Sequence, residues 1–226
     1  MMPTSNNKIH ILLQQQADIG KKYISFLLKQ YLAEKSDINY FYIQEKNTSF
    51  WDEIFNRFFT TKKAIFIISV NSSCFFYFKK YLEETNLLES IDESENNIFN
   101  HCVFSPGRKG EGAKETLDQI FCSIKKPGHT VVWENDNPGI KINGFTRGKD
   151  FRLKEFSEFK RIEKEVYAII SLPAESINFQ KDLSVHINTG KTFDQAIYTA
   201  ENNVIFRQRL YRIKKRSFEA IKNAGI

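Results

Sequence analysis

The regular alternation of short apolar runs with longer amphipathic stretches is the feature that most constrains how this chain can fold. The run Ala64–Ser69 is apolar at every position but its last, which is typical of a strand buried on both faces of a parallel sheet. Along Lys21–Glu34, apolar side chains instead recur three and four residues apart, which indicates a helix with one buried face. Because such strands and helices alternate, we predict an α/β fold: a mostly parallel sheet with helices on both faces and a long C-terminal helix.

The same patterns give the expected order of elements. The expected strands are Lys8–Leu13, Ile38–Ile43, Ala64–Ser69, Asn97–Phe104, His129–Trp133 and Val166–Leu172. The expected helices are Lys21–Glu34, Ser49–Phe59, Cys74–Leu88, Lys114–Ile124, Asp150–Glu165, Phe179–Asn188, Thr192–Thr199 and Asn202–Asn223. The glycine-rich segment 139–148 is expected to form a loop. We expect residues 1–200 to form one α/β domain and residues 201–226 to add a basic amphipathic helix that packs on the same domain.

Composition excludes several classes of protein. The chain has 226 residues, of which 41% are hydrophobic, so it can bury the core of one ordinary domain. Its apolar runs are far shorter than the roughly 20 residues of a membrane span, and Met1–Lys8 lacks the order of a secretory signal, so we expect a cytoplasmic protein. The three cysteines form no C-x-x-C pair and the histidines have no spaced partners, so no disulfide framework or metal site is predicted.

The net charge of +6 is concentrated near the C-terminus. The segment 207–216 contains no acidic residue and carries Arg207, Arg209, Arg212, Lys214, Lys215 and Arg216. These side chains form either a DNA-binding arm or the solvated face of a helix whose apolar residues pack on the sheet. Both interpretations stay open on the sequence alone.

The loop between the first strand and the first helix reads Q-Q-Q-A-D-I-G-K-K over residues 14–22. A strand, a loop and a helix in this order form a phosphate-binding loop in many proteins, because backbone N–H groups and the helix N-terminus converge there on an anion. Taken alone, the residues of the loop are more typical of an ordinary turn in which Asp18 caps the helix.

Motifs along nearly the whole chain resemble the StbB/TraL-type plasmid proteins, which are relatives of ParA and MinD in the deviant Walker (CobQ/CobB/MinD/ParA) nucleotide-binding superfamily. The matching segments are I-H-I-L-L-Q at 9–14, S-V-N-S-S-C-F at 69–75, V-V-W-E-N at 131–135, K-T-F-D-Q-A-I at 191–197 and F-R-Q-R-L-Y-R-I-K-K-R-S-F at 206–218. The resemblance implies a P-loop NTPase-like fold and a role in plasmid stability, partition or conjugal transfer. It also implies a plasmid-encoded partner protein and is compatible with a homodimer.

The resemblance also implies that the nucleotide site has degenerated. Gly20 and Lys21 persist from the phosphate-binding consensus, and Asn135 occupies the position at which relatives contact the base. The other motif positions hold Gln15, Ala17 and Asp18 for glycines, Gln16 for the signature lysine, Lys22 for the hydroxyl that binds Mg²⁺, and Ser69 for the acidic metal partner. Side chains at glycine positions crowd the approach of phosphate, and an ammonium cannot ligate Mg²⁺. We therefore expect ATP or ADP, if either binds, to contact Gly20, Lys21, Lys22 and Asn135 without Mg²⁺ and without hydrolysis.

Three alternatives remain at this stage. The first keeps a working ATPase in which Lys21 binds phosphate. The second is a DNA-binding accessory protein that acts through the basic C-terminal helix. The third is an NAD hydrolase of the TIR type, with Glu83 and Glu84 on an aromatic helix, although that fold has no place for the C-terminal half of this chain.

Overall fold

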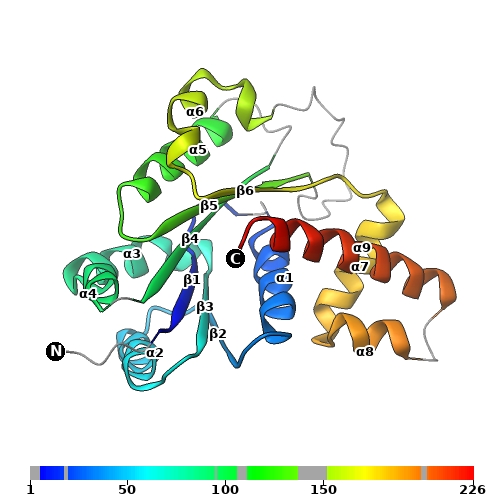
Figure 1. Cartoon of the computed structure of the whole chain (residues 1–226), viewed down its shortest axis with the longest axis horizontal. Coiled ribbons are helices and arrows are strands. Elements are labelled where there is room, and N and C mark those ends of the chain that lie inside the picture. Colours follow the sequence, from blue (N-terminus) through cyan, green and yellow to red (C-terminus); the bar gives the residue numbers. More distant parts are fainter. Residues whose placement is uncertain (1–5, 18–19, 95, 106–110, 137–151, 200–202) are drawn as a thin grey trace.

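A six-stranded, wholly parallel sheet forms the centre of the computed structural model, which describes residues 6–17, 20–94, 96–105, 111–136, 152–199 and 203–226 (Figure 1). The strands lie in the order β2-β3-β1-β4-β5-β6. Their bounds are β1 Lys8–Leu12, β2 Ile38–Ile43, β3 Ile65–Val70, β4 Asn97–Phe104, β5 His129–Asn135 and β6 Ala168–Leu172. The prediction of an α/β fold with a parallel sheet is therefore confirmed, and each expected strand is present.

The helices of the described chain cover both faces of the sheet. They are α1 Lys21–Ala33, α2 Thr48–Thr60, α3 Phe75–Glu84, α4 Leu87–Glu93, α5 Glu111–Ile124, α6 Ser157–Ile162, α7 Ile177–Thr189, α8 Phe193–Tyr198 and α9 Val204–Asn223. Short 3-10 turns form at Ser72–Cys74, Leu153–Glu155 and Glu163–Glu165. In Figure 1, α1 and α7–α9 lie on one side of the sheet, and α2–α6 lie on the other.

Alternation along the strands divides the apolar core between the two faces. Ile9 and Ile11 of β1 pack with α2–α4, whereas Leu12 of the same strand packs with α1, α8 and α9. A third cluster lies under α5 and α6 and includes Cys102 of β4 and Val132 of β5. Because β1 and β4 are central strands, both of their faces are buried, as their apolar runs predict.

Two of the expected helices differ in the structure. The expected helix Cys74–Leu88 is divided between α3 and α4, because Asn86 adopts a left-handed conformation with φ of 47°. The expected helix Asp150–Glu165 is reduced to α6 and its flanking 3-10 turns, and its first two residues lie outside the described ranges. The glycine-rich segment 139–148 also lies outside them.

The C-terminal helix α9 packs on the sheet face that carries α1. Leu210, Ile213 and Ile221 are buried in the same cluster as the apolar side chains of α1 and α8. Asn203 caps this helix by accepting a hydrogen bond from the backbone N–H of Ile205 at 2.7 Å. The helix is therefore an integral layer of this face of the core.

A buried chain of hydrogen bonds crosses the same face. Trp133 Nε1 lies 2.9 Å from His101 Nδ1, and His101 Nε2 lies 3.0 Å from His10 Nδ1. The indole can only donate, so His101 must accept at Nδ1 and donate from Nε2 to His10. Both imidazoles are consequently neutral, and burial holds the pKa of His10 well below 6.5 and lowers the pKa of His101 to about 3.

Candidate functional site

The candidate site is the loop between β1 and α1, at the carboxyl end of the sheet. The strand β1 lies between β3 and β4, and the chain leaves it toward α1 on one face, whereas it leaves β4 toward α5 on the other face. Ligands of parallel α/β sheets bind at such a reversal, outside the carboxyl ends of the strands. The fold therefore places the expected loop where a nucleotide site would form.

Gln14 fixes the beginning of the loop to β4. Its buried side-chain amide accepts a hydrogen bond from Val103 N at 2.8 Å and donates one to Val103 O at 2.9 Å. The backbone pairing of β1 with β4 ends at Ile11 and Asn100, so the Gln14 amide replaces a backbone pair beyond the end of the ladder. This contact holds the loop against the sheet edge.

Gln16 fixes the middle of the loop to α5. Its Oε1 accepts a hydrogen bond from Thr116 Oγ1 at 2.6 Å, and its Nε2 donates to Glu115 Oε2 at 3.1 Å. The residue is 8% exposed. At the position where the resembled family has a lysine that reaches across a dimer, this chain has a side chain that points into its own fold.

Lys21 is turned back into the loop. Its Nζ donates to the carbonyl oxygen of Gln14 and to Ser72 Oγ, the latter at 2.9 Å. Ser72 Oγ in turn donates to the carbonyl oxygen of Gln16 at 3.1 Å. Burial lowers the pKa of the Lys21 ammonium to about 8, because water solvates its charge only in part.

In this loop the backbone groups point in the opposite direction to those of a phosphate-binding loop. A phosphate cradle turns backbone N–H groups inward, toward the anion. Here the carbonyl oxygens of Gln14 and Gln16 point inward, and a lysine and a serine hydroxyl satisfy them. The side chains of Gln14, Gln16 and Lys21 are thus engaged within the protein.

The start of α1 retains some features of an anion site. Gly20, which precedes the helix, has a left-handed φ of 95°, a conformation that glycine adopts at little cost. No side chain caps the helix, and its first turn contains Lys21 and Lys22 but no acidic residue. Positive side chains at the positive end of the helix dipole are unfavourable unless an anion or inward-facing carbonyl groups compensate them.

The structure does not gather the remaining expected residues around this loop. Lys22 donates to Asn188 Oδ1 of α7 at 2.8 Å. Ser69, the penultimate residue of β3, is 1% exposed, and its hydroxyl lies near that of Tyr40. Asn135 ends β5 at the same sheet edge, is fully buried and is engaged within the protein.

Gln15 and Ala17 are exposed, whereas Asp18 lies outside the described ranges. Gln15 contributes to a cavity on the α3–α5 side of the loop. Within the described chain, no group of three or more His, Cys, Asp or Glu residues could hold a metal ion. The absence of a magnesium site remains a prediction, because the loop is described only in part.

Sequence reasoning assigned no role to several residues that hold the loop. Gln14 and Ser72 lie within segments that resemble the family motifs, whereas Glu115 and Thr116 lie in none of them. Gln16 and Thr116 are 100 positions apart, and no local pattern links them. Only the packing of α5 beside β1 and β4 brings them together.

Three of the six basic side chains in segment 207–216 of α9 form ion pairs within the protein. Arg209 binds Asp182 at 2.9 Å, Lys214 binds Asp194 at 2.8 Å and Glu34 at 2.9 Å, and Arg216 binds Glu175 at 2.8 Å. Arg212 and Lys215 are exposed, and the Nε of Arg207 is buried without a partner among the described residues. The helix thus combines internal ion pairs with a smaller exposed basic surface.

The structure also bears on Glu83 and Glu84 and on the expected lack of a membrane span. Glu83 and Glu84 are exposed and form pairs with Lys79 and Lys80 one turn earlier on α3. Among the helices that the structure describes, none combines the length and apolar content needed to cross a bilayer.

Comparison with known proteins finds similarity over the whole chain. Two proteins from Escherichia coli, each named Protein TraL, are 24% identical to it over 243 and 244 aligned residues. Each alignment covers 97% of this chain and 99% of the relative. No protein-family model matches the chain, and no solved structure matches it. The similarity to TraL proteins agrees with the motif resemblance, whereas membership of the ParA/MinD superfamily stays a prediction.

Proposed function

We propose that this protein is a degenerate, TraL-like relative of the ParA/MinD proteins that serves plasmid stability, partition or conjugal transfer without hydrolysing ATP. The similarity to TraL proteins along the whole chain supports the plasmid-related role. In this proposal the protein acts in the cytoplasm through contacts with a plasmid-encoded partner protein. A homodimer is compatible with this role, and light scattering of the purified protein measures it.

The proposal that ATP is not hydrolysed rests on one observation: the inward-facing side chains of Gln14, Gln16 and Lys21 are hydrogen-bonded to the protein itself. A triphosphate would have to break the Lys21 contacts and reverse the inward carbonyl groups before it could bind. Ser69 offers a buried hydroxyl where the family supplies a metal-binding carboxylate. Phosphoryl transfer depends largely on positioning and on the metal. The occupied Lys21 and the missing carboxylate at Ser69 therefore both argue against hydrolysis.

The test is equilibrium binding of ATP and ADP with and without Mg²⁺, together with release of labelled phosphate. We expect no Mg²⁺-dependent turnover and no Mg²⁺-dependent gain in affinity. Lys29→Ala is a matched control for Lys21→Ala, because Lys29 is an exposed lysine on the same helix. Turnover that Lys21→Ala abolishes and Lys29→Ala preserves would show that the loop is a working ATPase site.

Nucleotide binding without hydrolysis is the second candidate. The left-handed Gly20 and the uncapped start of α1 favour it, because they are the elements of an anion site. In this case Gly20, Lys21, Lys22 and Asn135 contact ATP or ADP after Lys21 and Lys22 leave their present partners. Binding that is independent of Mg²⁺ and weakened by Lys21→Ala would support it.

DNA binding through α9 is the third candidate, and exposed Arg212 and Lys215 favour it. Such binding would weaken steeply with salt, because phosphate contacts release counterions. The double variant Arg212→Gln/Lys215→Gln tests it. A matched control is Lys160→Gln/Arg161→Gln, which removes two exposed charges from α6 on the other side of the sheet. Duplex binding that both double variants weaken equally would reflect net charge rather than this helix.

A further inference from the structure

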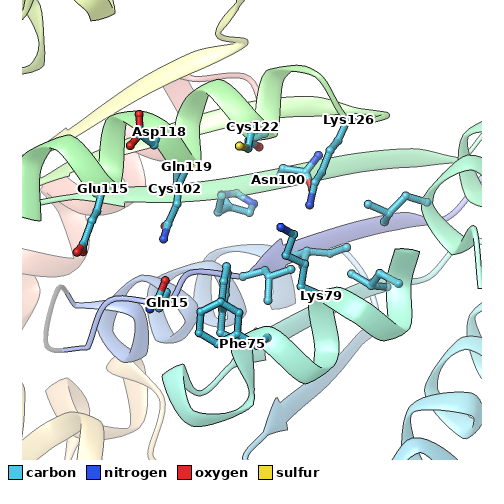
Figure 2. A pocket seen from close by; sticks show the side chains of 17 residues that line it. Gln15, Phe75, Lys79, Asn100, Cys102, Glu115, Asp118, Gln119, Cys122 and Lys126 are labelled. Carbon is cyan, nitrogen blue, oxygen red and sulfur yellow. The ribbon is translucent and has the colours of Figure 1, made fainter. Parts of the chain in front are cut away.

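A cavity of about 320 Å³ opens between α3 and α5, on the sheet face opposite α1 (Figure 2). Its floor includes Ile11 of β1 and Cys102 of β4. These two residues belong to separate core clusters, one under α2–α4 and one under α5 and α6. The cavity lies where the two clusters meet, and its volume is at the lower end of the range for small-molecule sites.

One end of the cavity is cationic. Figure 2 shows Lys79 of α3 and Lys126, just after α5, pointing into the same space from opposite walls. Burial raises the pKa of the Cys102 thiol to about 11, and the positive charge of Lys126 opposes that rise. The Lys126 ammonium therefore lies close to the floor of the cavity. Beside them, the buried Asn100 donates from Nδ2 to the carbonyl oxygen of Pro127 at 2.9 Å, which fixes this end of the cavity.

The carboxylates that line the cavity do not neutralise this end. Glu115 points toward the loop and accepts a hydrogen bond from Gln16, and Asp118 points away from the cavity (Figure 2). Lys79 has a carboxylate partner in Glu83 at 3.7 Å, but the two side chains are 41% and 59% exposed, so the pair is weak. Two lysines that face each other across a half-closed space favour an anion between them.

The α5 wall of the cavity contains a polar atom without a hydrogen-bond partner among the described residues. The side chain of Gln119 points from α5 toward the cavity (Figure 2), and its buried Oε1 has no donor within the described chain. A buried acceptor without a donor costs free energy, so this part of the wall would favour a ligand that also carries an N–H or O–H group on its body, which octanoate lacks. The remaining lining is largely apolar and includes Leu13, Phe75 and Leu82.

We propose that this cavity binds a small amphipathic organic anion, with its acidic group between Lys79 and Lys126 and its apolar body against Ile11, Leu13 and Leu82. The size of the cavity suits a short alkyl chain or one or two aromatic rings. This site is separate from the loop contacts of Lys21, and the inference does not depend on the proposed function.

Cys122 supplies a direct readout, because it is exposed and lines the cavity, whereas Cys74 and Cys102 are buried. The probes are octanoate, octanol and octylamine, which share an alkyl chain and differ in charge. Calorimetry measures binding, and mass spectrometry measures the rate at which iodoacetamide alkylates Cys122. We expect octanoate to bind saturably, to slow alkylation of Cys122 and to bind at least about tenfold more tightly than either other probe.

The variant Lys79→Gln/Lys126→Gln should weaken octanoate about tenfold and leave octanol unchanged. Lys80→Gln is the matched control, because Lys80 is on the same helix but its side chain is 72% exposed. Octanoate binding that survives the double variant, or that Lys80→Gln weakens equally, would overturn the proposal. So would an alkylation rate of Cys122 that saturating octanoate leaves unchanged.

Discussion

Acid should destabilise this protein through the buried pair His10 and His101. The two side chains are 0% and 2% exposed, and Trp133 and the neighbouring imidazole fix both in the neutral form. Because burial holds both pKa values below 6.5, the unfolded chain takes up protons first as the pH falls. The stabilisation is thus complete above pH 6.5 and is lost progressively toward the folded pKa, which for His101 is about 3.

The size of the effect follows from the same values. At pH 5, His101 remains neutral in the folded protein but is protonated in the unfolded chain, about 1.5 pH units below the ordinary pKa. Each unit corresponds to about 1.4 kcal/mol, so the free energy of unfolding falls by about 2 kcal/mol through His101 alone. His10 adds a loss of the same sign. This is a large part of the stability of an ordinary domain.

Urea unfolding at pH 7.5 and at pH 5.0 measures this loss. His101→Gln keeps an acceptor for the indole of Trp133 and cannot be protonated, so its loss between the two pH values should be smaller by about 2 kcal/mol. Because the test compares the change in the free energy of unfolding between the two pH values, it remains valid even if the variant is less stable than the wild type at both. His129→Gln is the control, because the His129 side chain is exposed. An equal loss in the wild type and in His101→Gln would refute the assignment of a neutral buried pair.

Three further perturbations test other parts of the structure. Gln14→Leu should lower the free energy of unfolding by about 2–3 kcal/mol in urea titrations, because both backbone groups of Val103 lose their partners. A loss below about 0.5 kcal/mol would contradict the role of Gln14 in fixing the loop to β4. Gly128→Ala should be more destabilising than Gly190→Ala in the same assay, because both have positive φ but only at Gly128 would a Cβ lie 2.5 Å from Ile98 Cβ; equal losses would refute this packing. The stability of wild type relative to Lys21→Met should rise as the pH increases from about 8 to 10.5, because the folded pKa of Lys21 is lowered; a flat difference would mean that Lys21 is solvated.

The sequence predicts the sheet well because buried parallel strands leave a local signal. The central strand Asn97–Phe104, buried after its first residue, has the expected bounds, and so does the partly buried edge strand Ile38–Ile43. The break between α3 and α4 was not predicted, because it depends on one left-handed residue, Asn86, within a continuous helical pattern. Helical periodicity describes which face is buried but not whether each backbone angle continues the helix.

The basic helix shows a different limit of sequence reasoning. Its periodicity predicts the buried face that contains Leu210 and Ile213. The acidic partners of Arg209 and Arg216 lie on α7 and in the preceding segment, at Asp182 and Glu175. A run of charges gives no information on such partners, because they depend on how α7 crosses α9.

The retention of Gly20 and Lys21 at the start of α1 does not by itself support an ATPase. In a nucleotide-binding loop, the lysine is retained because it binds phosphate. In this chain the Lys21 ammonium satisfies the carbonyl oxygen of Gln14 and the hydroxyl of Ser72, and Ser72 satisfies Gln16. Loss of Lys21 would therefore leave partly buried acceptors without this donor even if no nucleotide ever bound. The same side chain has a structural reason to persist after the chemistry is lost, so only its effect on turnover, and not its presence, distinguishes the two functions.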